Sequence, residues 1–211
     1  MRKHLGGLLV LLLLTGTGKA DIIFNTFGPG DTYNPNIGWA LGIPGIYQDI
    51  GQAFTPTGNS YTLDQLVLAV GWVLGTNAVD VSLMTAVGGL PGSVLETWHV
   101  TNLPSFGTGG PITVDSVLHP FLEQGTQYFV VSSVPLGEST WAGWNWNIAG
   151  TTGPLAFRTN GGPWSAFTDV QSALRAEGSP IPEPGTLGLL ALGMVVVTVY
   201  RWRRQEASTV A

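Results

Sequence analysis

Apolar and polar residues alternate along residues 79–83, where valine or leucine occupies every second position and aspartate or serine lies between them. A period of two predicts a β-strand with one apolar face. Residues 128–134 are apolar at their central positions, which predicts a strand buried on both faces. No window outside the two terminal apolar runs keeps a helical period. Eight further strand candidates lie between clusters of Gly, Pro and Asn, at residues 22–27, 48–54, 62–70, 94–100, 112–117, 140–146, 156–158 and 166–174.

The 30 glycines and 14 prolines of the 211-residue chain add many turn positions to this pattern. Residues 88–92 and 107–111 are typical turns, because glycine supplies a positive φ and proline fixes a negative one. Short strands without helical crossovers favour antiparallel pairing. We therefore expect an all-β fold for residues 21–175, an antiparallel and jelly-roll-like β-sandwich.

Charge is unevenly distributed along the chain. Residues 21–180 contain eleven acidic side chains and two basic ones, Arg158 and Arg175, and no lysine, so the net charge of this region is −9. Such a surface repels phosphate, which excludes nucleic acid as a partner. The chain has no cysteine, which also excludes disulfides, thiol nucleophiles and cysteine-ligated metals.

The amino terminus has the layout of a secretory signal peptide. Arg2 and Lys3 precede an apolar run at residues 8–14, and small residues follow up to Ala20. We expect a signal peptide over residues 1–20, cleaved between Ala20 and Asp21. The alternative is an uncleaved membrane anchor, but seven apolar residues fall short of the roughly 20 that span a bilayer.

The carboxyl terminus combines three elements in order. A linker at residues 176–186 contains Pro182, Glu183 and Pro184, and the two prolines keep the glutamate on an extended, accessible peptide. An apolar run at residues 187–200 follows, about 21 Å long as a helix, so residues 187–204 predict a short transmembrane helix. Its stop is an arginine cluster, which leaves residues 205–211 as a cytoplasmic tail. The cluster consists of Arg201, Arg203 and Arg204.

This arrangement resembles the PEP-CTERM sorting signal of Gram-negative bacteria. The resemblance implies recognition of Pro182, Glu183 and Pro184 by an exosortase, a membrane-embedded transpeptidase that removes the helix. It also implies transit through the inner membrane, then a place at the cell surface or in extracellular polysaccharide. The alternative is a permanent single-pass anchor.

A second resemblance covers most of residues 21–175. The phrases at residues 24–30, 52–56, 81–83 with 89–92, and 159–164 are similar to those of choice-of-anchor domains of exported bacterial proteins, the R type above all. These domains are grouped because similar folded domains occur with different surface-attachment signals. The resemblance implies a surface or matrix role and supplies no catalytic residues.

The tryptophans of residues 21–175 offer a candidate binding chemistry. Trp144 and Trp146 have the same parity in a predicted strand and so share one face, while Asn145 and Asn147 share the other. With Trp141, they are candidates for a platform on which neutral sugars stack. The alternative is that these rings pack in the core of the sandwich.

Other candidate sites have less support from the sequence. His99 and His119 are isolated and have no partner at metal-binding spacing, so we expect polar structural roles for both. The loop at residues 31–36 offers oxygen ligands for a structural Ca²⁺, with an Asx turn as the alternative. No nucleophile elbow is present. We expect a non-enzymatic surface or matrix protein, with a carbohydrate-binding module, or a glycan-active enzyme, as the alternative.

Overall fold

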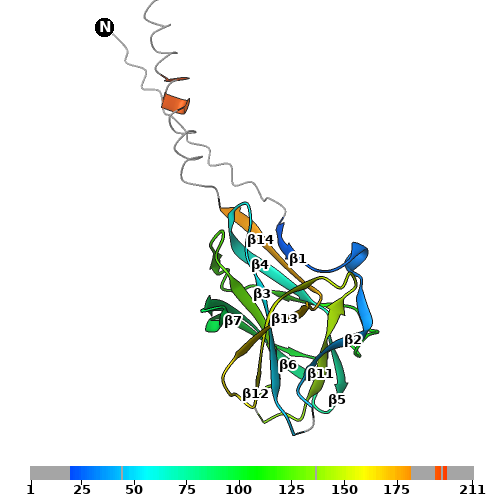
Figure 1. Cartoon of the computed structure of the whole chain (residues 1–211). Helices are drawn as coiled ribbons and strands as arrows, with labels where there is room; N and C mark the ends of the chain where they lie inside the picture. Colours follow the sequence, from blue (N-terminus) through cyan, green and yellow to red (C-terminus); the bar gives the residue numbers. More distant parts are fainter. Residues whose placement is uncertain (1–19, 44, 136, 182–192, 196, 199–211) are drawn as a thin grey trace, which may run out of the picture.

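The computed structural model describes residues 20–43, 45–135, 137–181, 193–195 and 197–198 (Figure 1). Within these residues the chain is nearly all β, and every ladder between named strands is antiparallel, as predicted. No helix in the described part is long and apolar enough to cross a membrane. Several predicted features lie outside the described residues: the signal peptide up to residue 19, the motif Pro182, Glu183 and Pro184, most of the apolar run, Arg201, Arg203, Arg204, and the tail.

The first sheet joins the two ends of the folded region. Its order is β1-β14-β4-β8, and a short ninth strand pairs with β4 alongside β8. The last strand therefore lies between the first strand and β4. The strands are β1 (Asp21–Asn25), β14 (Leu174–Ile181), β4 (Ser60–Leu68), β8 (Ile112–Asp115) and β9 (Phe121–Leu122).

The second sheet has six strands in the order β13-β12-β3-β10-β6-β7. The third has the order β2-β11-β5. The strands of the second sheet are β13 (Ser165–Val170), β12 (Thr152–Thr159), β3 (Gln48–Phe54), β10 (Tyr128–Ser133), β6 (Ala78–Val87) and β7 (Leu90–Thr101). Those of the third are β2 (Tyr33–Leu41), β11 (Trp141–Asn147) and β5 (Val70–Leu74), and a short 3₁₀ turn (Pro29–Asp31) precedes β2.

One apolar core takes side chains from all three sheets. Val79, Val81 and Leu83 of β6 are fully buried in it, which confirms the alternation predicted for residues 79–83. Strand β10 is buried on both faces, as predicted: Val130 belongs to this core, and Phe129 belongs to a smaller cluster on the opposite face of the sheet.

The predicted domain boundary is wrong. Residues 176–181, expected to be linker, belong to β14, and Ala176 is fully buried in the core. The candidate strand at 166–174 is in fact β13 followed by the start of β14. Strands β2, β5 and β9 were not expected as separate strands.

Three backbone segments meet where the first and third sheets adjoin: the β4–β5 junction, the residue before β14, and strand β11. The amide of Asn145 donates to the carbonyl of Ala69 (2.8 Å), that of Ala69 to Ala173 (3.2 Å), and that of Ala173 to Asn145 (2.8 Å). This ring satisfies the backbone groups that leave the regular ladders at these points. It thus connects the first and third sheets through the main chain.

Candidate functional site

Strand β14 leads directly into the predicted sorting motif. Ile181 pairs with Ser60 of β4, so the strand stays paired up to the residue before Pro182. Pro180 pairs with Tyr61 of β4, and within the described residues β1 pairs with β14 only as far as Gly178. A strand edge is where the missing N–H of proline is tolerated. The motif therefore begins without a flexible spacer after the folded domain.

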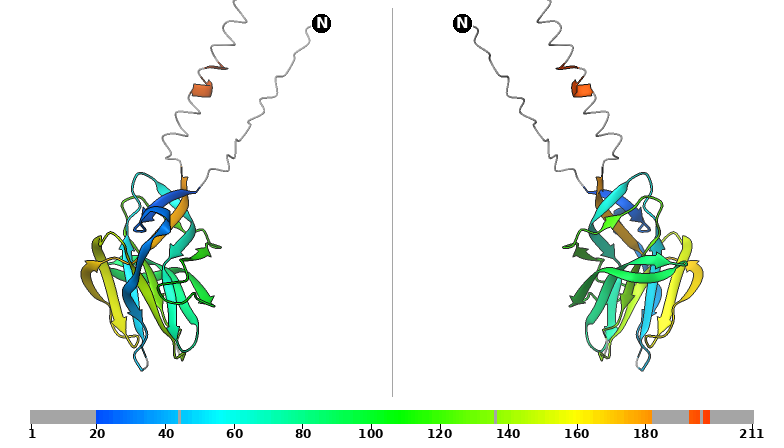
Figure 2. Two further views of the ribbon diagram at one scale, coloured as in Figure 1. Left: turned by 90° about the vertical axis from the view of Figure 1, so that its right-hand side faces the viewer. Right: turned by 90° about the vertical axis from the view of Figure 1, so that its left-hand side faces the viewer.

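The start of β1 lies beside the end of β14. Asp21 pairs with Gly178 in the antiparallel ladder, and both strand ends lie at one end of the domain (Figures 1 and 2). The segments expected to reach the membrane, residues 1–20 and 182–204, thus join the domain at the same end. The first and last strands of the folded domain therefore begin and end next to each other.

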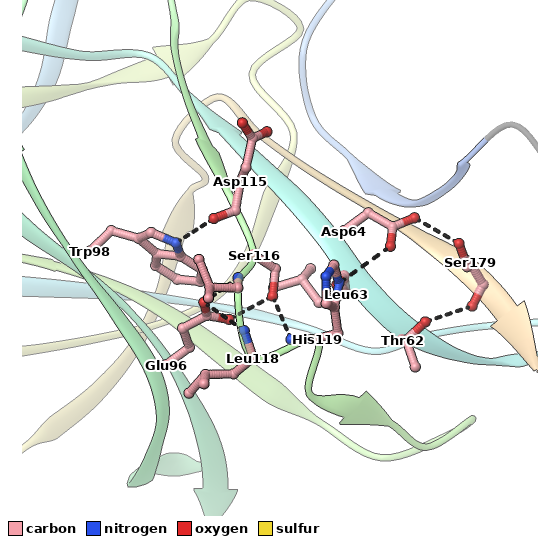
Figure 3. A network of polar contacts seen from close by, with 11 residues as sticks. Thr62, Leu63, Asp64, Glu96, Trp98, Asp115, Ser116, Leu118, His119 and Ser179 are labelled. Carbon is pink, nitrogen blue, oxygen red and sulfur yellow. Dashed lines mark hydrogen bonds and ion pairs between the residues drawn. The ribbon is translucent and has the colours of Figure 1, made fainter.

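Polar side chains fasten β14 to the strand beside it (Figure 3). The Ser179 hydroxyl donates to Oδ2 of Asp64 at 2.9 Å. Nδ1 of His119 lies 3.7 Å from the other carboxylate oxygen and 3.0 Å from the carbonyl oxygen of Leu63. Because a carbonyl only accepts, Nδ1 carries the proton in this contact. Asp64 thus links the end of β14 to the loop that contains His119.

A buried carboxylate shapes the same loop. Glu96 of β7 is 5% exposed and accepts hydrogen bonds from the Ser116 hydroxyl (2.6 Å) and from the amides of Val117 (2.7 Å) and Leu118 (3.2 Å). The Ser116 oxygen in turn accepts from the amide of His119 at 2.9 Å. One side chain therefore satisfies three donors of a tight turn, a role filled elsewhere by secondary structure.

The order of contacts in this network differs from that of a hydrolase. In a Ser-His-Asp triad the imidazole takes the proton of the serine hydroxyl. Here Ser179 donates directly to Asp64, and His119 contacts the other side of that carboxylate. Ser116 likewise donates to Glu96 rather than to an imidazole. The arrangement holds strands and a loop in place.

The predicted tryptophan platform does not form a solvent-facing row. Trp144 is fully buried, and its indole N–H donates to the carbonyl of Ala173 at 3.0 Å. Trp146 is half-buried, and its ring centroid lies 5.4 Å from that of Trp39. Trp141 is half-buried and lines a separate cleft of about 350 Å³ with Phe106. The three rings therefore do not offer one surface to a glycan.

The two asparagines predicted on the opposite face of the strand from these rings have structural roles. Asn145 and Asn147 are buried, and their amides donate to the carbonyls of Asn34 (3.0 Å) and Gln171 (2.6 Å). The pairing of β11 with β2 shifts register between the two asparagines.

The loop at residues 31–36 has an ion pair where Ca²⁺ was considered. The carboxylate of Asp31 contacts the Arg175 guanidinium, which also pairs with Glu177 at 2.5 Å. Oδ1 of Asn34 accepts from the Asn36 amide at 3.1 Å, as the Asx-turn alternative predicts. Within the described ranges, no three His, Asp or Glu side chains gather as a metal site would require.

Two further polar pairs lie on the outer face of the second sheet. His99 contacts Asp80 through Nδ1 at 2.8 Å. Asp49 accepts from Nε of Arg158 at 2.6 Å, and that guanidinium lies 4.6 Å from the ring centre of Trp164. Burial raises the pKa of the Asp49 carboxyl above its ordinary value of 3.8, while Arg158 opposes the rise.

Comparison with known proteins identifies the carboxyl terminus. No curated protein matches the chain. A structure of the cysteine protease and lectin-like domains of Cwp84, a surface layer associated protein of Clostridium difficile, is similar with a TM-score of 0.46 and 15% identity over 64% of this chain. The chain spans 32% of that structure. Residues 180–205 match the PEP-CTERM protein-sorting motif. This motif implies processing by an exosortase and export to the cell envelope and surface, so the chain carries a PEP-CTERM sorting signal, as its sequence predicts.

Proposed function

We propose that the chain is a non-enzymatic protein displayed at the cell surface or in the extracellular matrix after an exosortase acts at Pro182, Glu183 and Pro184. The observation that carries the proposal is the placement of the motif immediately after β14, at the end of the domain where β1 also begins. The contacts of His99 and His119, which hold neighbouring groups, support a role without catalysis.

The length of chain between the domain and the membrane supports this function. Residues 182–186 separate β14 from the apolar run at residues 187–200, and five extended residues span at most about 17 Å. The folded domain is thus held close to the membrane surface before processing. The motif then lies close to the membrane in which the enzyme is embedded.

We also propose that residues 21–181 form a jelly-roll-like β-sandwich of the choice-of-anchor R type. The main core, in which side chains of the first and second sheets meet, supports a sandwich. The phrases that resemble choice-of-anchor domains support the type. One of them, at residues 52–56, begins in β3, a central strand of the second sheet that ends at Phe54.

The test is mass spectrometry of the carboxyl-terminal peptide from membrane and extracellular fractions of the native host. We expect the wild-type chain to end within or beside residues 182–184. Glu183→Gln should retain residues 187–204 and stay in the membrane fraction. Glu206→Gln, a matched change of a carboxylate beyond the arginines, should be processed normally. A wild-type peptide that continues through Arg204 in the membrane fraction would instead identify a permanent anchor.

A further inference from the structure

A cleft of about 350 Å³ opens between the edge of the second sheet and strand β2. Phe157 pairs with Ile50, and Phe167 pairs with Leu155, so both phenylalanines project from the face of the sheet that carries the core. Strand β13 is the edge strand of this sheet. At that edge the same face of the sheet extends beyond the apolar core. The lining consists of Trp39, Gln48, Ile50, Phe157, Phe167 and Asp169.

The three aromatic rings of the cleft support one another. The ring centroid of Phe167 lies 5.3 Å from that of Trp39 and 5.6 Å from that of Phe157, both edge to face. The indole N–H of Trp39 donates to the carbonyl of Val170 at 3.0 Å, which fixes the ring against β13. Phe157 is 38% exposed. The rings are thus preorganised, with apolar surface open to solvent.

Two polar groups complete the lining. Oδ1 of Asp169 accepts from the amide of Val170 at 2.7 Å. Its Oδ2 and the side-chain amide of Gln48 make no hydrogen bond with another described residue and so remain free for a ligand. A few polar groups among aromatic rings are the usual composition of a small-ligand site.

Charge narrows the class of ligand. The only charged group in the lining is a carboxylate, and residues 21–180 contain no lysine, so an anionic ligand meets repulsion. A neutral sugar ring fits both features, because its C–H face is apolar and its hydroxyls exchange hydrogen bonds with amide and carboxylate groups.

We propose that this cleft binds a neutral sugar unit of a polysaccharide, with Phe157 and Trp39 as stacking surfaces and Gln48 and Asp169 as hydrogen-bond partners. The site goes beyond the proposed function and uses none of the three tryptophans considered from the sequence. It belongs to the folded domain, so its test does not depend on processing at residues 182–184.

The test is affinity electrophoresis of the full-length chain in a sugar-free polyoxyethylene detergent. The gels contain dextran, xyloglucan or hydroxyethyl cellulose as neutral probes, and alginate as the anionic one. We expect at least one neutral probe to retard the wild type and alginate not to. Phe157→Ala should weaken the affinity about tenfold or more. Asp169→Asn keeps the shape of the cleft and should weaken it several-fold.

Phe121→Ala is the matched control, because Phe121 is 53% exposed on β9 of the other sheet. It should leave the retardation unchanged, and circular dichroism establishes that each variant folds. No retardation by any neutral probe overturns the proposal. Equal retardation by alginate, or equal loss in Phe121→Ala and Phe157→Ala, does the same. If Phe157→Ala does not fold, unchanged binding by Asp169→Asn overturns the proposed contacts.

Discussion

Replacing Glu96 by alanine should destabilise the domain more than any other change of a single carboxylate in the network of Figure 3. Its carboxylate is 5% exposed and accepts from the hydroxyl of Ser116 and from two backbone amides. Removing it leaves three donors without their acceptor. The side chains of Val117 and Leu118 are exposed, so water reaches part of this turn and reduces the penalty.

The expected loss follows from those contacts. A hydrogen bond to a charged group contributes about 1.5–3 kcal/mol, and removing a buried carboxylate also relieves its desolvation. We therefore expect Glu96→Ala to lower the free energy of unfolding by about 3 kcal/mol. Glu96→Gln keeps one acceptor oxygen for the amides, while the Ser116 hydroxyl can turn to accept from the new NH₂ group. It should lower that free energy by about 1 kcal/mol.

Urea unfolding followed by circular dichroism measures both changes. Glu123→Ala is the control, because its carboxylate accepts only the exposed Thr126 hydroxyl at 3.3 Å, and it should cost less than about 0.5 kcal/mol. Amide exchange at Val117 and Leu118 should accelerate in Glu96→Ala. The reasoning is refuted if Glu96→Ala costs no more than Glu123→Ala, or if the two amides keep their protection.

Two further variants test the core and one charged pair. Trp144→Ala should cost about 3–5 kcal/mol in urea unfolding, because it empties a fully buried site and removes the hydrogen bond to Ala173; a cost below about 1 kcal/mol would contradict that burial. Since the pKa of Asp49 is raised by burial, the folded state holds its proton at pH values where the unfolded state has lost it. Its contribution to stability therefore falls as pH rises from 3.8 through the raised value. Asp49→Asn should remove this slope, and parallel pH profiles would contradict it.

Local pattern predicted the strands whose faces differ in polarity. Strand β3 has the predicted bounds, and β6 contains the predicted alternation. Strand β2 was missed because Asn34, Pro35 and Gly38 indicate a turn, although proline is tolerated at a sheet edge. The candidate at residues 62–70 runs past the end of β4 to the first residue of β5, because the change of sheet at Ala69 interrupts no apolar run; residues 71–74 were missed.

The candidate sites also differ in how far local sequence could predict them. The sorting motif is contiguous, so its residues could be identified from order and spacing alone. The aromatic cleft combines residues of β2, β3, β12 and β13, and only strand pairing brings them together. The tryptophans of β11 were assigned to one face from parity, which does not show whether that face is buried. Nothing local in the sequence distinguishes the buried Trp144 from the half-buried Trp141.

The corrected boundary changes what the carboxyl terminus does for the fold. Strand β1 pairs with β14, and no other strand partner of β1 occurs in the described residues. A chain that ended at residue 175 would leave β1 mostly unpaired and would expose the edge of β4. The first sheet is therefore complete only after residues 174–181 have been exported. Because the sorting motif follows at residue 182, export of the motif comes directly after export of the strand that completes the domain.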